Sequence, residues 1–168
     1  MSSMLLRDVT LRAYKSGDIG RITLSHAAYY QLNWQFDASF EAERAKELAD
    51  YISAFNKKSD AMWVAEHEGQ FAGSIAIDGK EGETTDARLR WFIVEPEWQG
   101  KGIGQKLIEQ ALVFCRERGY KKIALWTFAG LDPARVIYER AGFRLTEATP
   151  KKIYGKNITE QKFELTLV

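Results

Sequence analysis

Several features that would point to other classes of protein are missing from this sequence of 168 residues. Its single cysteine, Cys115, excludes an internal disulfide and fits a reducing compartment. No apolar run approaches the length of a membrane span, and the first residues contain no signal-peptide apolar region. The net charge of +1 creates no overall field that would recruit nucleic acid or a membrane. We therefore expect a cytoplasmic protein that binds neither.

The composition favours one globular unit. An apolar fraction of 45% and five tryptophans are enough for a packed core, and no linker, repeat or low-complexity tract divides the chain. We expect a single domain over residues 1–168. Cys115 falls on the apolar stripe of an expected helix and is interpreted as a packed thiol. No Cys/His grouping has metal-ligand spacing, so no metal is expected.

Hydrophobic periodicity and turn residues predict a chain of alternating elements. Helices are expected over 18–31, 39–55, 102–118 and 132–142, and strands over 9–14, 61–66, 70–77, from Leu89, over 121–128, 143–148 and 161–168. The polar segment 78–86 is expected to be a loop. The two central strands are joined through a helix and must be parallel. The predicted fold is α/β (α+β): a mixed, mostly antiparallel sheet with a parallel central pair, flanked by four helices.

A glycine-rich turn follows the central strand and leads directly into a helix. Its glycines, Gly100, Gly102 and Gly104, stand at alternate positions. A strand, a glycine turn and a helix N-terminus together suit an anionic phosphate group. The dinucleotide fingerprint does not fit, because Gln105 stands where it needs its third glycine. A P-loop does not fit either, because no Gly-Lys pair is followed by serine or threonine.

Two motifs and the element order resemble one known family. The segment Gln99-Gly100-Lys101-Gly102-Ile103-Gly104 resembles the Q/R-x-x-G-x-G/A signature of the GCN5-related N-acetyltransferases, the GNAT family. Residues 134–143 look like that family's A-x-x-x-Y-E-x-x-G-F segment. The segments 63–74, 89–96, 125–135 and 154–165 look like the acetyltransferase half of proteins in which this domain follows a MarR-type DNA-binding domain. We expect the DNA-binding domain to be absent here, since the first expected strand begins within ten residues of Met1.

The resemblance implies a cofactor and a set of residues that hold it. Acetyl-coenzyme A is the implied co-substrate, with its pyrophosphate on the backbone of the Gln99–Gly104 segment. The backbone of Phe92, Ile93 and Val94 is implied to pair with the pantetheine arm, and one amide there would polarise the thioester carbonyl. Lys101 and Lys106 either add local positive charge or are ordinary solvated lysines. By its match to the family tyrosine, Tyr138 is implied to protonate the departing thiolate.

The resemblance is weaker where a general base is needed. Family members often place a glutamate at positions that correspond here to Arg88 and Trp126, and an asparagine where Leu131 stands. None of these three side chains is a base. The remaining candidates are Glu95, Glu147, Asp86 and His26, and we assign none of them.

An acceptor pocket is expected over the central strands. The aromatic side chains of Tyr29, Tyr30 and Trp34 either line this pocket or belong to the core.

The function that this resemblance implies is direct transfer of an acetyl group from acetyl-coenzyme A to a primary amine, and a small molecule is the expected acceptor. Acetylation of a protein or peptide is the alternative from the same fold. A domain that binds acetyl-coenzyme A as a sensor and turns over poorly is an alternative of another class. Dimerisation is plausible for the family, so a homodimer is a further prediction.

Overall fold

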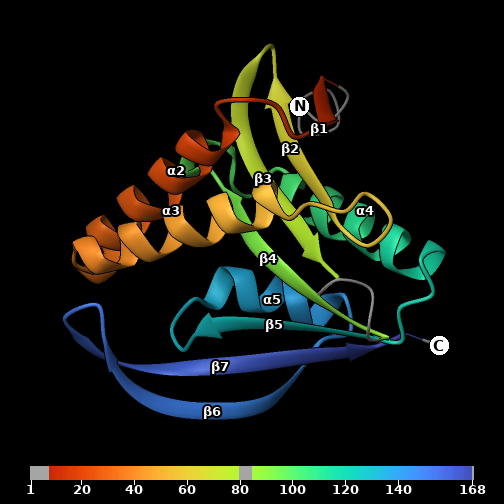
Figure 1. Ribbon diagram of the computed structural model, residues 1–168. Helices are drawn as coiled ribbons and strands as arrows, with labels where there is room; N and C mark the ends of the chain where they lie inside the picture. Colours follow the sequence, from red (N-terminus) through yellow and green to blue (C-terminus); the bar gives the residue numbers. More distant parts are fainter. Residues whose placement is uncertain (1–7, 80–84, 168) are drawn as a thin grey trace.

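A seven-stranded sheet forms the centre of the fold in the computed structural model, which describes residues 8–79 and 85–167 (Figure 1). Its order is β1-β2-β3-β4-β5-β7-β6. The strands are β1 (Val9–Ala13), β2 (Ala61–His67), β3 (Gln70–Asp78), β4 (Asp86–Val94), β5 (Lys122–Phe128), β6 (Arg144–Ile153) and β7 (Lys156–Thr166). All neighbouring strands are antiparallel except β4 and β5, which are parallel. The predicted mixed sheet with a parallel central pair is confirmed.

Four α-helices cover the two faces of the sheet in the described residues, as predicted. They are α2 (Asp18–Trp34), α3 (Ala38–Ser53), α4 (Ile103–Glu117) and α5 (Asp132–Arg140), and a short 3₁₀ turn, η2 (Pro96–Trp98), follows β4. Buried side chains of α4 and α5 share one apolar cluster with the sheet, whereas those of α2 and α3 form a second cluster with it. No helix in the described part of the chain is both long and apolar enough to span a membrane. Residues 80–84 of the predicted loop lie outside the described residues.

The parallel strands β4 and β5 stay together for only a short distance. Their register covers three pairs, in which Asp86–Arg88 lie opposite Lys122–Ala124. Beyond Arg88 the two strands diverge, as Figure 1 shows, while β5 remains paired with β7 along its whole length. The residues of β4 after Arg88 therefore have an edge that faces an opening in the sheet.

An irregularity in β4 lies at the side of this opening. The register between β3 and β4 shifts between Ser74 and Ala76, and Trp91 opposite has a φ of 47°. Such a φ is unfavourable for a bulky side chain and persists only where the surroundings enforce it. Trp91 is buried in the cluster of α2 and α3, and its carbonyl oxygen accepts a hydrogen bond from Ser74 Oγ at 2.8 Å. These contacts hold the irregularity in place.

The last two strands are longer than the sequence indicated. We expected strands over 143–148 and 161–168, but β6 runs to Ile153 and β7 begins at Lys156. Tyr154 and Gly155 between them both have positive φ, of 56° and 76°, which is the conformation of a tight two-residue hairpin turn. The pattern hid this hairpin because β6 is an exposed edge strand with few apolar residues.

The close passage of β3 against β4 gives the first testable prediction. A Cβ atom added at Gly73 would lie 2.5 Å from the carbonyl oxygen of Ile93. We expect Gly73→Ala to lower the free energy of unfolding by about 1–3 kcal/mol, measured by denaturant titration. Gly20→Ala on α2 is the control, because a Cβ there has no atom within 4 Å, and it should change stability by less than about 1 kcal/mol. Equal stability of the two variants would contradict the packing described for Gly73.

Candidate functional site

The glycine turn after β4 ends in an uncapped helix N-terminus. Gly100 and Gly102 have φ values of 74° and 86°, which residues with a Cβ rarely adopt. Gly102 is the N-cap of α4 and has no side chain to satisfy the amides of the first turn. A Cβ at Gly100 would meet no atom within 4 Å, so the space above the turn is open. Free amides and the positive end of the helix dipole make this turn suitable for an anionic group.

The third glycine has a packing role. A Cβ at Gly104 would lie 3.0 Å from Cδ1 of Ile137 and 3.2 Å from Cζ of Phe92. Glycine at this position therefore lets the start of α4 approach both β4 and α5 closely.

The side chains of the other predicted loop residues are bound to the protein itself. Lys101 Nζ donates to the carbonyl oxygen of Glu97 at 2.7 Å, and Lys106 Nζ donates to that of Val9 at 2.8 Å. Ile103 is buried in the core with 1% of its surface exposed. Any ligand contact of Lys101 or Ile103 is therefore expected from the backbone.

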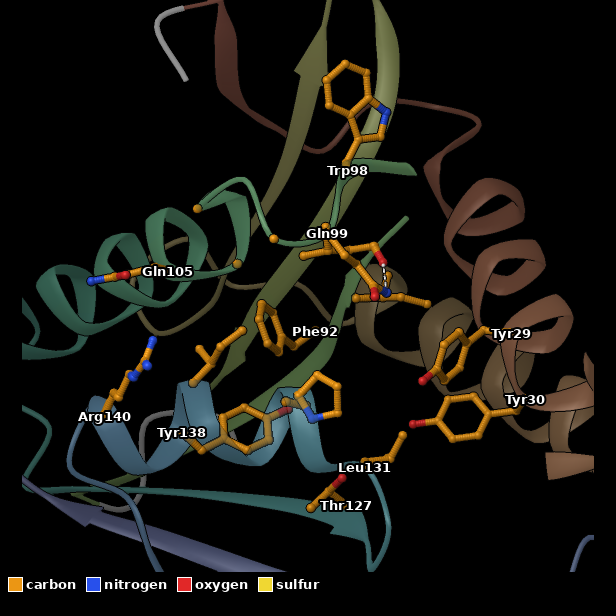
Figure 2. Close-up of a pocket in the computed structure, with 18 residues that line it drawn as sticks. Tyr29, Tyr30, Phe92, Trp98, Gln99, Gln105, Thr127, Leu131, Tyr138 and Arg140 are labelled. Atoms are coloured by element: carbon orange, nitrogen blue, oxygen red, sulfur yellow. Dashed lines mark hydrogen bonds between the residues drawn. The ribbon is translucent and has the colours of Figure 1, made fainter. Parts of the chain in front are cut away.

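A cavity of about 380 Å³ extends from this turn along the opening in the sheet (Figure 2). Its lining includes Gln99 and the three glycines at one end, Phe92, Ile93 and Val94 along β4, and Tyr138 of α5. The structure thus brings together most of the residues predicted to hold a cofactor.

The backbone of β4 presents hydrogen-bonding groups to this cavity. The amide of Glu95 donates to the carbonyl oxygen of Ala72 on β3 at 2.9 Å. Because alternate residues of an antiparallel strand point to opposite neighbours, the amide and carbonyl of Val94 are directed away from β3 and into the opening. The Val94 carbonyl accepts from Gln99 Nε2 at 3.1 Å. This geometry makes the Val94 N–H a backbone donor on the side of the cavity.

Tyr138 supplies a phenolic hydroxyl deep in the same cavity. Only 5% of the residue is exposed, and its ring packs against Phe92 with centroids 5.7 Å apart. In the described part of the chain its hydroxyl has no hydrogen-bond partner, and Figure 2 shows it pointing into the cavity. Burial raises the pKa of Tyr138, so the phenol keeps its proton at neutral pH.

Two of the three predicted acceptor-pocket aromatics reach the cavity. Tyr29 and Tyr30 line it, and their hydroxyls point across it from α2 (Figure 2). Trp34 does not line it; its ring packs 5.8 Å from that of Phe36 and 6.0 Å from that of Phe128 in an aromatic cluster.

A second cavity of about 200 Å³ lies on the α3 side of β4. It shares Tyr30, Phe92, Thr127 and Tyr138 with the first cavity, so the two adjoin at these four residues. Charged side chains line it from several elements: Glu43, Arg44 and Glu47 of α3, Arg88 and Arg90 of β4, and Lys151 and Glu160 of the last hairpin. The sequence pattern had not led us to expect that these charged side chains gather around one cavity. On α3 these charges looked like an ordinary solvated face, and only the alternation of Arg88 and Arg90 in a buried strand could have indicated them.

The structure places the four candidate bases in different surroundings. His26 lines the second cavity, where burial lowers its pKa to about 4 and its Nδ1 donates to the carbonyl oxygen of Ile22 at 2.9 Å. The carboxylates of Glu95, Glu147 and Asp86 line neither cavity. Glu95 lies 3.5 Å from an Arg21 nitrogen, and Glu147 is largely exposed. Within residues 8–79 and 85–167, no three potential metal-ligating side chains gather as a site.

Comparison with known proteins identifies the family. Residues 26–143 match the model of the Acetyltransferase (GNAT) family. The chain is 32% identical over 99 residues to the uncharacterized N-acetyltransferase YjgM of Escherichia coli, a match that covers 57% of this chain and 58% of that protein. It is 29% identical over 122 residues to the N-acetylaspartate synthetase of Danio rerio, covering 72% of this chain and 43% of that protein. The chain thus spans about half the length of these relatives.

Solved structures share the fold over nearly the whole chain. The protein yncA of Salmonella typhimurium, solved with acetyl-CoA, superposes with a TM-score of 0.76 at 19% identity, covering 96% of this chain and 95% of that chain. The spermidine N-acetyltransferase of Vibrio cholerae, in complex with CoA and spermine, gives 0.71 at 23% identity, covering 95% and 96%. With the glycine turn, the opening between β4 and β5 and the match over 26–143, these findings show that the chain belongs to the GNAT family of acetyltransferases.

Proposed function

We propose that this protein transfers the acetyl group of acetyl-coenzyme A to the primary amine of a small molecule. The observation that carries the proposal is the opening between β4 and β5. It has an uncapped helix N-terminus at one end and the buried hydroxyl of Tyr138 at the other. The first cavity suits a long cofactor with a phosphate group and a reactive thioester. The second cavity, of about 200 Å³, suits a small acceptor.

The glycine turn and β4 would hold the cofactor through their backbone. Amides at the start of α4 would bind the pyrophosphate, aided by the helix dipole. The edge of β4 from Phe92 to Val94 would pair with the pantetheine amides like an added strand. The Val94 N–H would then donate to the thioester carbonyl, where negative charge develops as the amine attacks. Removing one such donor typically costs about 3 kcal/mol of transition-state stabilisation.

Tyr138 would act as the general acid. The amine nitrogen forms a bond to the carbonyl carbon, the carbon–sulfur bond breaks, and the phenol protonates the departing thiolate. The nitrogen becomes cationic as it attacks and gives up one proton, directly or through water, to the tyrosine phenolate. A neutral amine thus yields an amide and a free thiol, and the phenol of Tyr138 is restored. With ordinary pKa values near ~8.5 for a thiol and ~10 for tyrosine, this proton transfer is uphill by roughly 2 kcal/mol. Burial raises the pKa of Tyr138, which makes the transfer harder unless burial in the same cavity also raises the pKa of the bound thiol.

The acceptor must lose a proton before it attacks. For an alkylamine with a pKa near ~10.4 this costs about 4–5 kcal/mol at pH 7. The carboxylates that line the second cavity are each held in an ion pair, and His26 is a weak base because burial lowers its pKa to about 4. An acceptor of lower pKa, or proton loss through water, would suit this site.

Other features of the sequence stay predictions. They are the single domain over 1–168, a cytoplasmic location, a homodimer, and the similarity to the acetyltransferase half of MarR-type fusion proteins.

The phosphate role of the turn can be tested with Gly102→Glu. The new carboxylate would stand at the helix N-terminus and repel the pyrophosphate, so affinity for acetyl-coenzyme A should fall at least about a hundredfold, or roughly 3 kcal/mol, in calorimetry. Gly119→Glu at the other end of α4 is the control. Gly119 also has a positive φ, of 76°, with open space around it, so it carries the same backbone strain away from the cavities. Unchanged affinity in Gly102→Glu would refute the phosphate role.

The role of Tyr138 can be tested with Tyr138→Phe, which removes the proton and keeps the packing of the ring. We expect turnover to fall at least about a hundredfold, as for other general acids, while affinity for acetyl-coenzyme A stays within about twofold. Tyr51→Phe is the control, because Tyr51 is also buried and its hydroxyl bonds to the carbonyl oxygen of Ile77 outside both cavities. Full activity in Tyr138→Phe would leave Tyr138 as a packing residue only.

A further inference from the structure

Seven charged side chains line the second cavity, and among the described residues only Arg88 has no ionic partner. Its Nε atom is buried without a hydrogen-bond partner, and no carboxylate of the described chain lies within ion-pair distance of it. Its guanidinium lies over the ring of Trp126, 4.6 Å from the centroid. Arg88 also belongs to the last registered pair of β4 with β5, so it lies where the opening begins.

The carboxylates nearby are all bonded to other groups. Glu47 pairs with Arg90 at 2.7 Å and with Arg44 at 3.0 Å. Asp78, which stands opposite Arg88 in the register of β3 and β4, pairs with Arg90 at 3.0 Å. Glu43 pairs with Arg44 at 2.9 Å and accepts from the Tyr154 hydroxyl at 2.8 Å.

On the far wall of the cavity, Glu160 pairs with Lys151 at 2.8 Å. Of the four cations and three carboxylates that line the cavity, Arg88 is the one that takes part in no ion pair with another described residue.

A partly buried guanidinium without an ion pair is costly, because it has lost water and gained no counter-charge. Burial, with a smaller effect of the neighbouring Arg90, lowers the pKa of Arg88 to about 10, which still leaves it charged at neutral pH. Stacking on the indole of Trp126 offsets part of the cost and holds the guanidinium plane. What the site lacks is an anion. A planar guanidinium with free N–H groups is suited to a carboxylate, which it can bind through two parallel hydrogen bonds.

We propose that the acceptor amine carries a carboxylate and that Arg88 binds it. This inference rests on the proposed acetyl transfer. In this arrangement the acceptor lies in the second cavity with its carboxylate at Arg88 and its amine toward Tyr138, where the two cavities meet. A polycationic amine would instead bring further positive charge beside an unpaired arginine. The acceptor class is therefore amino acids and related amino carboxylic acids, and polyamines are disfavoured.

The test measures thiol release from acetyl-coenzyme A with matched acceptors. Each amino carboxylic acid, with the amine α to the carboxylate or further from it, is compared with its own carboxamide, and spermidine is included. We expect at least one acid to exceed its carboxamide at least tenfold in kcat/KM. In Arg88→Gln this preference should disappear because the KM for the acid rises. The kcat/KM for the carboxamide and the affinity for acetyl-coenzyme A should stay unchanged. Arg88→Lys should restore part of the preference, because lysine keeps the positive charge but cannot form the two parallel hydrogen bonds of a guanidinium.

Arg118→Gln is the matched control. Arg118 also lies over an aromatic ring, that of Phe114 at 4.8 Å, but it is outside both cavities. The Arg118→Gln variant should therefore keep the acid-to-carboxamide preference of the unmodified protein. A merely structural role of Arg88 would lower the rates for acid and carboxamide together and would not change their ratio. That result, or a preference that persists in Arg88→Gln, would overturn the inference while leaving acetyl transfer intact. Preferred transfer to spermidine or to the carboxamides would overturn it in the same way.

A binding measurement separates the inference from the proposed function. N-acetylated acids are the expected products and can be titrated into the protein with coenzyme A in calorimetry. If these products bind the unmodified protein but not Arg88→Gln, the carboxylate site is supported. This holds even if no acceptor in the panel turns over. In that case the proposed acetyl transfer would fail and the carboxylate site would stand. If the acids and their carboxamides bound equally, the carboxylate site would be refuted.

Discussion

The site depends on the separation of two parallel strands in the middle of a continuous sheet. Strands β4 and β5 pair over three residues, and β5 then continues with β7 while β4 turns away. Backbone groups at a sheet edge need partners, and an unpaired edge inside a protein is costly unless something completes it. The irregularity at Trp91, held by its burial against α2 and α3 and by Ser74, lies in the part of β4 that has left β5. A ligand with amide groups can complete this edge.

The same separation divides the site into two functional ends. The glycine turn and the start of α4 offer free amides at one end of the first cavity, and Tyr138 lies where this cavity meets the second. Cofactor and acceptor would thus approach the phenol from opposite faces of the sheet. The first cavity depends on backbone groups, which suits a cofactor common to a whole family. The second depends on charged side chains, which suits an acceptor particular to this protein.

The glycine turn, β4 and Tyr138, all named from the sequence, line one cavity in the structure, whereas the charged side chains of the second cavity were not foreseen. The glycine turn, the order of the elements and Tyr138 follow from local patterns, since glycine spacing and hydrophobic periodicity are written in short segments. The pairs of Glu47 with Arg44 and Arg90, and the position of Arg88 over Trp126, depend on α3, β4 and β5 meeting in space. Nothing in the local sequence of α3 distinguishes these charges from a solvated face. The hairpin turn at Tyr154 and Gly155 was missed because its strands are polar and exposed.

The most direct test of the acetyl-transfer site is a crystal structure of the protein with coenzyme A. We expect the pyrophosphate to bind the amides that open α4 and the pantetheine arm to pair with β4 from Phe92 to Val94. The sulfur should lie within hydrogen-bond distance of the Tyr138 hydroxyl. A cofactor bound outside the opening, or strands β4 and β5 closed together along their length, would contradict this arrangement.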